Sequence, residues 1–437
     1  MRHGFWHYAL GLIGVLFCNA GEMSMASPQQ TLPIVFVHGD SDTAGHWFAQ
    51  MQRFASNGYP LDHLFAVDIP HPSARADDST AEQNRSSTQD AAEAVAREVD
   101  RALSATGADK VVLIGNSRGC QTARNYEKNF GGRGKVAKMI LTGCVHNGVF
   151  VSQQTALGSE YNGAGHFLTA LNQEPVIPPD VDVITIRSDK FDLYSQPDGR
   201  FIGSPGTATG ANYESPELKG ADNRVLSGVD HRETGYSPAA FAIMYKAITG
   251  HDPQTKDIIP ETDPVLSGKV SAQENSAPTN RPLVGAKLDI YETDPDTGSR
   301  KGGTAYSTVI GEDGRWGPFQ TKSGAAYEFV ITSENQPVTR IFRSPFLRSS
   351  DFIHIRLYPA PETGQSRVHI MRPRGYFGPD DKALANGKTM PGIPTDTPVP
   401  HVWQSTVAVD TSMASTVRAE FEGEKIAARY DPDQPDS

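Results

Sequence analysis

The stretch Val111-Val112-Leu113-Ile114-Gly115-Asn116-Ser117-Arg118-Gly119 joins an apolar run to a motif of the form G-x-S-x-G. The apolar run is typical of a strand that is buried on both faces of a parallel sheet. In the motif, a serine stands on a sharp turn between such a strand and a helix, so that its hydroxyl group points outward. A Cβ atom at either Gly115 or Gly119 would press on the opposite arm of the turn. The sequence therefore predicts that Ser117 is a nucleophile at the edge of a parallel sheet.

Short apolar runs and helical patterns alternate on both sides of this turn. Further runs have the composition of buried strands, at residues 33–37, 64–67, 137–142 and 181–186. Helices are expected after the capping residue Ser87, from the serine turn to about Phe130, and from Pro238 to Ile248. Alternating strands and helices form a parallel sheet with helices on both faces. We therefore expect residues 27–250 to form one doubly wound α/β domain.

The pattern changes at His251. Three Asp-Pro or Ile-Pro pairs make residues 251–264 a linker, and the chain that follows is rich in alternating strand patterns and turns. Residues 265–437 are therefore predicted to form an all-β region, a small sandwich or barrel. Its last part, from Pro361 onward, is too weakly patterned to divide further.

Length, charge and motifs exclude some kinds of partner. A chain of 437 residues exceeds one ordinary domain, and its formal net charge is −11. Such a charge argues against binding to nucleic acid or to an anionic membrane surface. The sequence shows no metal-binding residue set with a recognised spacing and no phosphate-binding glycine loop, so no metal and no cofactor is predicted.

The N-terminus has the pattern of an export signal. Arg2 and His3 precede a short apolar stretch at residues 8–17, and Ser24-Met25-Ala26 offers a cleavage site. The apolar stretch is too short to cross a bilayer as a permanent helix. We therefore expect residues 1–26 to be a signal peptide, and the cleaved chain to be secreted or periplasmic without a transmembrane segment.

Two cysteines, Cys120 and Cys144, remain after such a cleavage. An exported chain with two cysteines favours a disulfide, because the compartment is oxidising. Cys120 follows the serine turn and Cys144 ends the strand expected beside it, so that the two side chains can be neighbours. Two buried free thiols are the alternative.

A serine hydroxyl becomes a good nucleophile only beside a base that a third group holds in place. On this kind of sheet the acid and then the histidine follow the serine in the chain. His231, in a loop before the last helix, is the predicted base, whereas His146 and His166 come before the expected acid loop.

The acid is expected just after the strand at residues 181–186. Asp189 and Asp192 are both available there. A catalytic acid usually stands a few residues beyond the end of the strand, so that its loop can bend toward the histidine. This argument favours Asp192 and leaves Asp189 as the alternative.

An oxyanion hole needs two backbone N–H groups that point at the developing negative charge. One is expected from Arg118, the residue after the nucleophile. The other is expected from Asp40, at the exit of the first strand. The carboxylate of Asp40 must point away from that charge, toward Arg118 or a backbone amide.

With Val37-His38-Gly39, the G-x-S-x-G motif and His231 identified, residues 27–250 resemble the α/β-hydrolase superfamily, and most closely its secreted lipases and esterases. Residues 265–358 are similar to transthyretin-like or carboxypeptidase-regulatory-like β-sandwich modules. The whole resembles two-domain prokaryotic lipases with a C-terminal β-domain. Lipases often have His where this chain has Asn116, and an apolar residue where it has Asp40. These departures bear on the class of substrate.

The resemblance implies a secreted serine carboxylic-ester hydrolase that acts on acyl esters through Ser117, His231 and Asp192, with an acyl-enzyme intermediate. One alternative is a polyester depolymerase whose β-domain docks on a lipid or polymer interface, with Trp316, Phe319 or Trp403 as anchors unless they belong to the core. Another is a non-catalytic adhesion protein with a vestigial hydrolase fold. Since all three triad residues precede Gly250, a chain that ends there is expected to remain active on small soluble esters.

Overall fold

The computed structural model describes residues 31–275, 277–334, 336–358, 366–372, 374–378, 381–390, 397–402, 404–409, 412–421 and 424–432. The predicted signal peptide at residues 1–26 and the predicted anchor Trp403 lie outside the described residues. Residues 32–437 belong to one compact unit. Within the described residues, no helix combines the length and the apolar composition that a membrane crossing requires.

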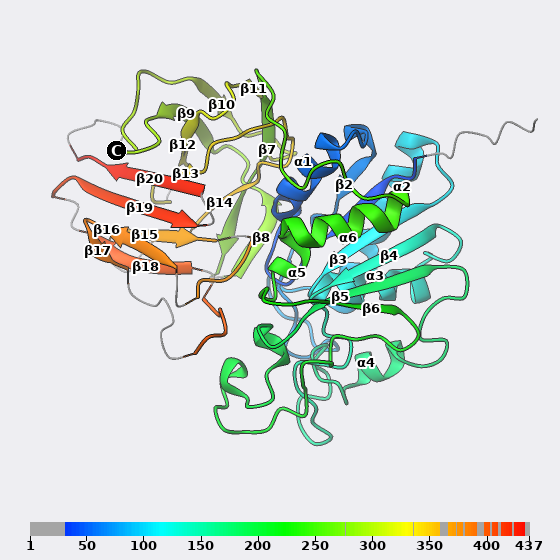
Figure 1. The fold of residues 1–437 in the computed structure, drawn as a ribbon. Helices are drawn as coiled ribbons and strands as arrows, with labels where there is room; N and C mark the ends of the chain where they lie inside the picture. The colour runs from blue at the N-terminus through cyan, green and yellow to red at the C-terminus, as the bar shows by residue number, and fades with distance from the viewer. Residues whose placement is uncertain are drawn as a thin grey trace, which may run out of the picture. The chain divides into compact units, whose positions relative to one another are not determined.

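A six-stranded sheet lies at the centre of the N-terminal half (Figure 1). The order of its strands is β2-β1-β3-β4-β5-β6, and every neighbouring pair is parallel. The strands are β1 (Ile34–Val37), β2 (Leu64–Ala66), β3 (Val111–Asn116), β4 (Val136–Thr142), β5 (Asp182–Ser188) and β6 (Asp222–Leu226). The predicted doubly wound parallel sheet is therefore confirmed.

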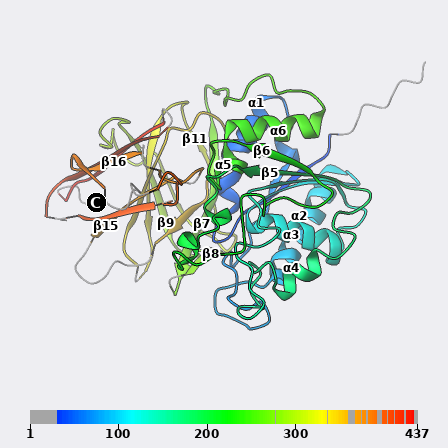
Figure 2. The same ribbon diagram turned by 60° about the horizontal axis from the view of Figure 1, so that its bottom comes forward.

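Helices cover both faces of this sheet, with α1 and α6 on one side and α2 and α3 on the other (Figure 2). Alternate residues of β1 explain why: Val35 and Val37 belong to the core cluster under α2 and α3, whereas Ile34 and Phe36 belong to the cluster under α1 and α6. The helices are α1 (Phe48–Ser56), α2 (Thr88–Thr106), α3 (Arg118–Asn129), α4 (His166–Leu171), α5 (Glu233–Tyr236) and α6 (Pro238–Thr249).

Local signals explain where the two long outer helices begin and end. The hydroxyl of Ser87 accepts a hydrogen bond from the N–H of Asp90, whose side chain reaches back to the N–H of Ser87, and this capping box begins α2. At α6 the hydroxyl of Ser237 accepts a hydrogen bond from the N–H of Ala240, and a proline stands at the first helical position. Gly107 and Gly250 end these helices in the left-handed conformation.

A β-sandwich follows, which we call the first β unit (residues 265–358). One sheet has the order β10-β9-β12-β13, and the other has the order β11-β7-β14 with β8 paired to β7. The strands are β7 (Val265–Glu274), β8 (Ala277–Pro282), β9 (Lys287–Thr293), β10 (Tyr306–Val309), β11 (Arg315–Gln320), β12 (Ala326–Thr332), β13 (Thr339–Arg343) and β14 (Ile355–Leu357). Trp316 and Phe319 are buried in its core, and therefore do not form a docking surface.

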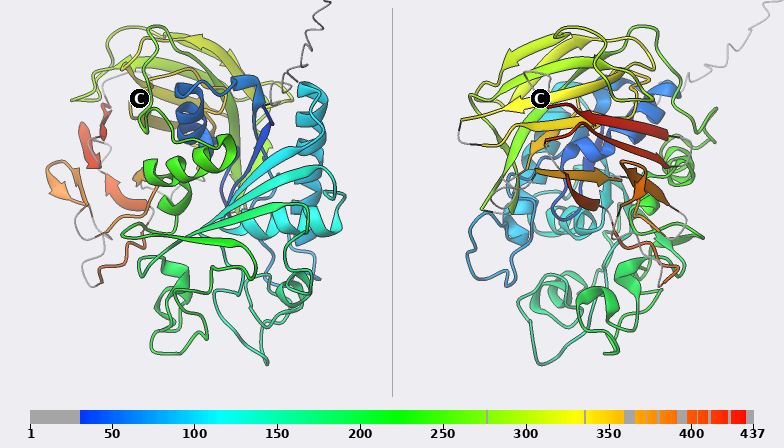
Figure 3. Two further views of the ribbon diagram at one scale, coloured as in Figure 1. Left: turned by 45° about the vertical axis from the view of Figure 1, so that its right-hand side comes forward. Right: turned by 90° about the vertical axis from the view of Figure 1, so that its left-hand side faces the viewer.

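The segment that the sequence left undivided forms further strands, which we call the second β unit (residues 366–430). Here β15 pairs with β18, and a four-stranded sheet has the order β17-β16-β19-β20. The strands of this unit are orange to red in Figure 3. The strands are β15 (Ser366–Met371), β16 (Lys382–Ala385), β17 (Lys388–Thr389), β18 (Gln404–Val409), β19 (Ser415–Phe421) and β20 (Glu424–Tyr430). Its core is separate from that of the first β unit and includes Phe377, Met390 and Val417.

Candidate active site

Ser117 stands at the turn between β3 and α3, as the motif predicts. Its backbone has φ 53° and ψ −122°, a sparsely populated conformation for a residue other than glycine. A Cβ atom at Gly115 would lie 2.7 Å from the carbonyl oxygen of Gly119, and a Cβ atom at Gly119 would collide with the carbonyl oxygen of Val37. The two glycines therefore allow the turn to close against β1.

Asp192 and His231 form a buried pair. Nδ1 of His231 lies 2.9 and 3.0 Å from the two carboxylate oxygens of Asp192, and each side chain is 2% exposed. The backbone N–H of Tyr194 donates to the same carboxylate across 2.9 Å. Nε2 of His231 is buried and has no hydrogen-bond partner among the described residues. One ring nitrogen is therefore held by the acid, and the other is available to a further group.

The alternative acid, Asp189, has other partners. Its carboxylate accepts hydrogen bonds from the backbone N–H groups of Lys190 and Gly228, at 2.6 and 3.2 Å. These contacts join the loop after β5 to the loop after β6. The structure thus brings Asp192 to His231 and leaves Asp189 as a loop-stabilising residue.

A cavity of about 280 Å³ lies at this edge of the sheet. Ser117, His231 and Asp40 all line it, whereas His146 and His166 do not. The other lining residues are Gly39, Ser41, Asp42, Asn116, Val145, Val149, Tyr161, Tyr194, Ile202, Arg232 and Tyr376. The predicted nucleophile and base therefore line the same cavity.

Comparison with known proteins identifies the family. The model of the alpha/beta hydrolase family matches residues 34–279, which is more than half of the chain. The chain belongs to the alpha/beta hydrolase family. A second model, that of the lipase C-terminal domain, matches residues 263–359 and covers the first β unit. No curated protein matches the chain.

Solved structures of lipases are among those similar to this hydrolase. The mature form of Bacillus licheniformis lipase BlEst2 is 20% identical, over 52% of this chain and 95% of that one, with a TM-score of 0.38. Its propeptide form is 14% identical over 93% and 94% of the two chains, also with a TM-score of 0.38. Aspergillus fumigatus lipase B is 18% identical, and the match spans 52% of this chain and only 54% of that one, with a TM-score of 0.37.

The two amides predicted for the oxyanion hole belong to Asp40, which follows Gly39 in the chain, and to Arg118, which follows Ser117. Gly39 packs closely on the serine, since a Cβ atom at Gly39 would lie 3.2 Å from Cβ of Ser117. The N–H groups of Asp40 and Arg118 donate to no acceptor within the described part of the chain. Both amides are therefore available to an oxygen atom bound in the cavity.

The carboxylate of Asp40 is held by three donors. It accepts hydrogen bonds from the N–H of Ala74 at 2.8 Å, the hydroxyl of Tyr161 at 2.9 Å and the hydroxyl of Ser41 at 2.8 Å. The donors are a backbone amide, as the sequence argument required, and two hydroxyl groups. These contacts hold the negatively charged carboxylate of Asp40 in one orientation within its loop.

The side chain of Arg118 is fully buried beneath the turn. Its guanidinium group contacts Glu160 at 2.5 Å and donates to the carbonyl oxygens of Pro72 and Ser86 at 2.9 and 3.0 Å. Because Tyr161 follows Glu160, the same short segment binds both the side chain of Arg118 and that of Asp40. The side chain of Arg118 therefore serves to hold the segment between β4 and β5.

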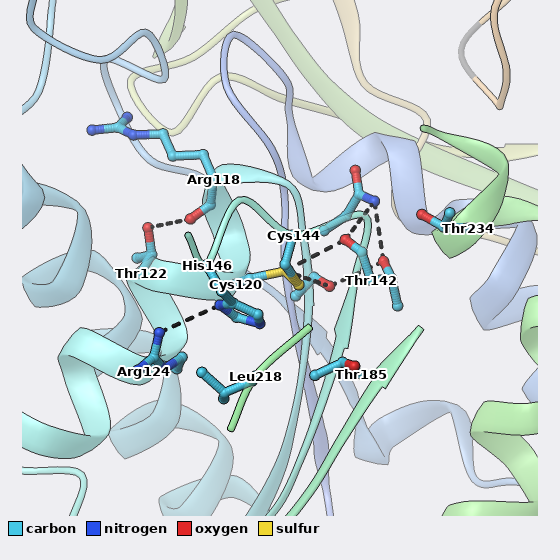
Figure 4. The surroundings of a disulfide bond; sticks show 12 residues. Arg118, Cys120, Thr122, Arg124, Thr142, Cys144, His146, Thr185, Leu218 and Thr234 are labelled. Atoms are coloured by element: carbon cyan, nitrogen blue, oxygen red, sulfur yellow. Dashed lines mark hydrogen bonds between the residues drawn. A yellow bond between two sulfur atoms is a disulfide. The ribbon is translucent and has the colours of Figure 1, made fainter. Parts of the chain in front are cut away.

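A disulfide lies at the start of α3, where Cys120 stands three residues after Ser117 in the chain (Figure 4). It joins Cys120 in the first turn of α3 to Cys144 just beyond β4, with Cα atoms 5.7 Å apart. Of the two alternatives that the sequence leaves open, the structure therefore has the bridge. It fixes the start of α3 to the neighbouring strand.

Sequence analysis did not predict the tyrosines and the ion pair that complete the cavity. The ring of Tyr194 lies edge-on to that of His231, with centroids 4.6 Å apart, and Tyr376 from the second β unit lies 6.4 Å from it. Arg232 forms a buried ion pair of 2.5 Å with Asp42. The pattern Asp230-His231-Arg232 was visible, but nothing in it indicated Tyr376, which is 145 residues away.

Proposed function

We propose that this hydrolase is a serine carboxylic-ester hydrolase, with Ser117 as nucleophile, His231 as general base and Asp192 as the acid that orients the histidine. The observation on which this depends is the Asp192–His231 pair beside the cavity that Ser117 lines. The strained backbone of Ser117 supports the proposal, because such conformations cluster at functional sites. The family membership supports a hydrolase activity.

In the proposed reaction, Oγ of Ser117 attacks the ester carbonyl carbon and its proton passes to Nε2 of His231. The carbonyl oxygen becomes an alkoxide, which the N–H groups of Asp40 and Arg118 stabilise. The bond to the leaving alcohol then breaks, and the alcohol oxygen takes the proton from His231. Water loses a proton to His231, attacks the acyl-enzyme and releases the acid, and Ser117 regains its proton.

We infer that the substrates are compact esters. The cavity of about 280 Å³ lies just below the range for ligand sites, roughly 300–1,000 Å³. Three tyrosines, two aspartates and three aliphatic side chains line it, the last being Val145, Val149 and Ile202. The polymer-docking alternative gains no support from Trp316 and Phe319, since both are buried.

We also propose that the chain works in an oxidising compartment after loss of residues 1–26. The pattern of the N-terminus and the disulfide between Cys120 and Cys144 support export. On this proposal residues 27–250 are the catalytic domain, 251–264 the linker and 265–437 the β-domains.

Labelling with a fluorophosphonate tests the proposed function. The reagent should phosphonylate Ser117 in the unaltered chain, as found by mass spectrometry of the labelled peptide, and should not label Ser117→Ala. Turnover of p-nitrophenyl esters should fall by about 10⁴-fold or more in that variant, whereas the exposed-loop variant Ser204→Ala should match the parent. Labelling of Ser117→Ala, or none of the parent, contradicts the assignment. Acetate and butyrate esters should be preferred over palmitate if the cavity sets the chain length.

A further inference from the structure

One wall of the cavity is the segment Gly39–Asp40–Ser41–Asp42, which we call the 39–42 loop. It bears the proposed oxyanion amide of Asp40, so that its position decides whether that amide reaches the substrate. Two side chains from the first β unit contact the backbone of this loop. They are Asn280 on β8 and Arg356 on β14.

The carbonyl groups of the loop are the atoms that these side chains hold. Nη1 of Arg356 donates to the carbonyl oxygen of Ser41 at 3.2 Å, and Nη2 reaches that of Asp42 at 3.5 Å. Nδ2 of Asn280 donates to the carbonyl oxygen of Asp42 at 2.9 Å and to that of Ile69 at 2.9 Å. The carbonyl groups of Ser41 and Asp42 therefore both accept hydrogen bonds from residues that lie more than 230 positions further along the chain.

The two side chains also hold each other. Nη2 of Arg356 donates to Oδ1 of Asn280 at 2.7 Å, and Nε donates to the carbonyl oxygen of Thr279 at 3.1 Å. The backbone N–H of Asn280 donates to the carbonyl oxygen of Pro70 at 2.9 Å. A planar guanidinium group with several partners loses little freedom per hydrogen bond, so that the pair presents its donors in fixed directions.

The loop needs such support because its backbone is strained. Ser41 has φ 62°, in the left-handed region that residues other than glycine seldom occupy. Conformations of this kind persist only where the surroundings determine them. On its other side the loop is bound through the ion pair of Asp42 with Arg232, the residue after His231. Arg356 and Asn280 thus complete a frame that fixes the loop between the β unit and the histidine.

We propose that Arg356 and Asn280 are positioning residues for the oxyanion amide of Asp40, and that the first β unit is therefore part of the active site. The proposal rests on the proposed function, since it concerns the same reaction. It assigns to the β unit a role in the rate of the chemical step, rather than in docking to a surface.

The test compares variants of the full chain that differ in their contact with the loop. Arg356→Ala removes the two N–H groups, on Nη1 and Nη2, that donate from Arg356 to the loop. Arg356→Lys keeps the positive charge but lacks the planar guanidinium group. Asn280→Asp keeps the shape but places an acceptor against the carbonyl oxygens of Asp42 and Ile69. Arg343→Met is the matched control, because Arg343 lies in the same unit against Phe48 of α1 and does not contact the loop.

The rate and the stoichiometry of fluorophosphonate labelling separate a positioning role from a structural one. The loop variants should label Ser117 to full stoichiometry, but about 10- to 100-fold more slowly. Their kcat for p-nitrophenyl butyrate should fall by a similar factor while KM changes less than about threefold, since an oxyanion contact strengthens in the transition state. Arg343→Met should match the parent. If Arg356→Ala does not fold, Arg356→Lys and Asn280→Asp provide the same comparison.

Normal labelling rates in the folded loop variants would overturn the proposal and leave the proposed function intact. Partial stoichiometry at the parent's rate would also overturn it, because it would indicate a misfolded fraction rather than a displaced amide. If the parent itself is not labelled at Ser117, the proposed function fails, and this proposal fails with it.

Discussion

The backbone N–H of Tyr376 donates a hydrogen bond of 2.5 Å to the carboxylate of Asp230, the residue before His231. The other oxygen of that carboxylate accepts from the N–H groups of Arg232 and Glu233, at 2.8 and 2.9 Å. Asp230 thereby closes the turn in which the histidine stands, and the second β unit binds to that turn. The two β units thus contact different loops of the hydrolase: the first binds the 39–42 loop, and the second binds the histidine loop.

These contacts change what is expected of a shortened chain. Removal of residues after 360 leaves every proposed triad member in place but takes away Tyr376 and its bond to Asp230. We expect kcat/KM for p-nitrophenyl acetate to fall at least about 10-fold, because small displacements of a catalytic group are costly. A chain that ends at Gly250 also lacks Asn280 and Arg356 and should lose more. Full activity of either shortened chain on this small ester, measured beside circular dichroism spectra, would restore the expectation from the sequence.

The side chain of Tyr376 is expected to limit the size of the substrate. Its ring lines the cavity, and the guanidinium group of Arg232 lies 5.8 Å from the ring centroid. Tyr376→Ala should enlarge the cavity and raise the ratio of kcat/KM for the octanoate ester to that for the acetate ester by about 10-fold. Tyr376→Phe keeps the ring and the backbone bond and is the control. An unchanged ratio in Tyr376→Ala would mean that the acyl chain does not bind against the ring of Tyr376.

Paired asparagine variants test the choice of acid. Asp192→Asn should lower kcat by about 10⁴-fold, because the histidine would lose the charge and the tautomer that its Nδ1 partner imposes. Asp189→Asn changes contacts with Ser188, Lys190 and Gly228, none of which is a proposed triad member, and should lower kcat less than about 10-fold. Steady-state kinetics on one ester suffice for both variants, and the reverse order of effects would transfer the role to Asp189.

Local patterns predicted the parts of the site that depend on neighbours in the sequence. The strand before Ser117, its two flanking glycines and the helix after it follow from sterics within nine residues, and the order of acid and histidine follows from the direction of the sheet. The contacts of Arg356 and Tyr376 do not, because they join residues 145 to 315 positions apart. No periodic pattern in the sequence indicates a contact between residues so far apart in the chain. The described strands of the second β unit are short, and the sequence between them is rich in proline and glycine, so that its pattern is too weak to divide.

Removal of the disulfide should cost stability. Cys120 and Cys144 close a loop with a sequence separation of 24 residues, for which chain entropy alone gives about 3–4 kcal/mol. The double variant Cys120→Ala/Cys144→Ala should therefore lower the free energy of unfolding in urea by about that amount. Dithiothreitol should destabilise the parent and leave the double variant unchanged. Equal stability of parent and variant would mean that the bridge does not constrain the unfolded chain.

Acid should destabilise the fold through three buried histidines. Burial lowers the pKa of His38, His46 and His146 below the ordinary value of 6.5, and for His146 the cation of Arg124 lowers the pKa further. The folded chain keeps these rings neutral, whereas the unfolded chain binds protons once the pH falls below about 6.5. The free energy of unfolding should therefore decrease from pH 7 to pH 5, by up to about 1.4 kcal/mol per pH unit for each histidine. Urea unfolding at pH 8, 7, 6 and 5 measures this slope, which His146→Asn should reduce by about a third. A flat profile between pH 7 and pH 5 would show that the rings are protonated in the folded chain as readily as in the unfolded one.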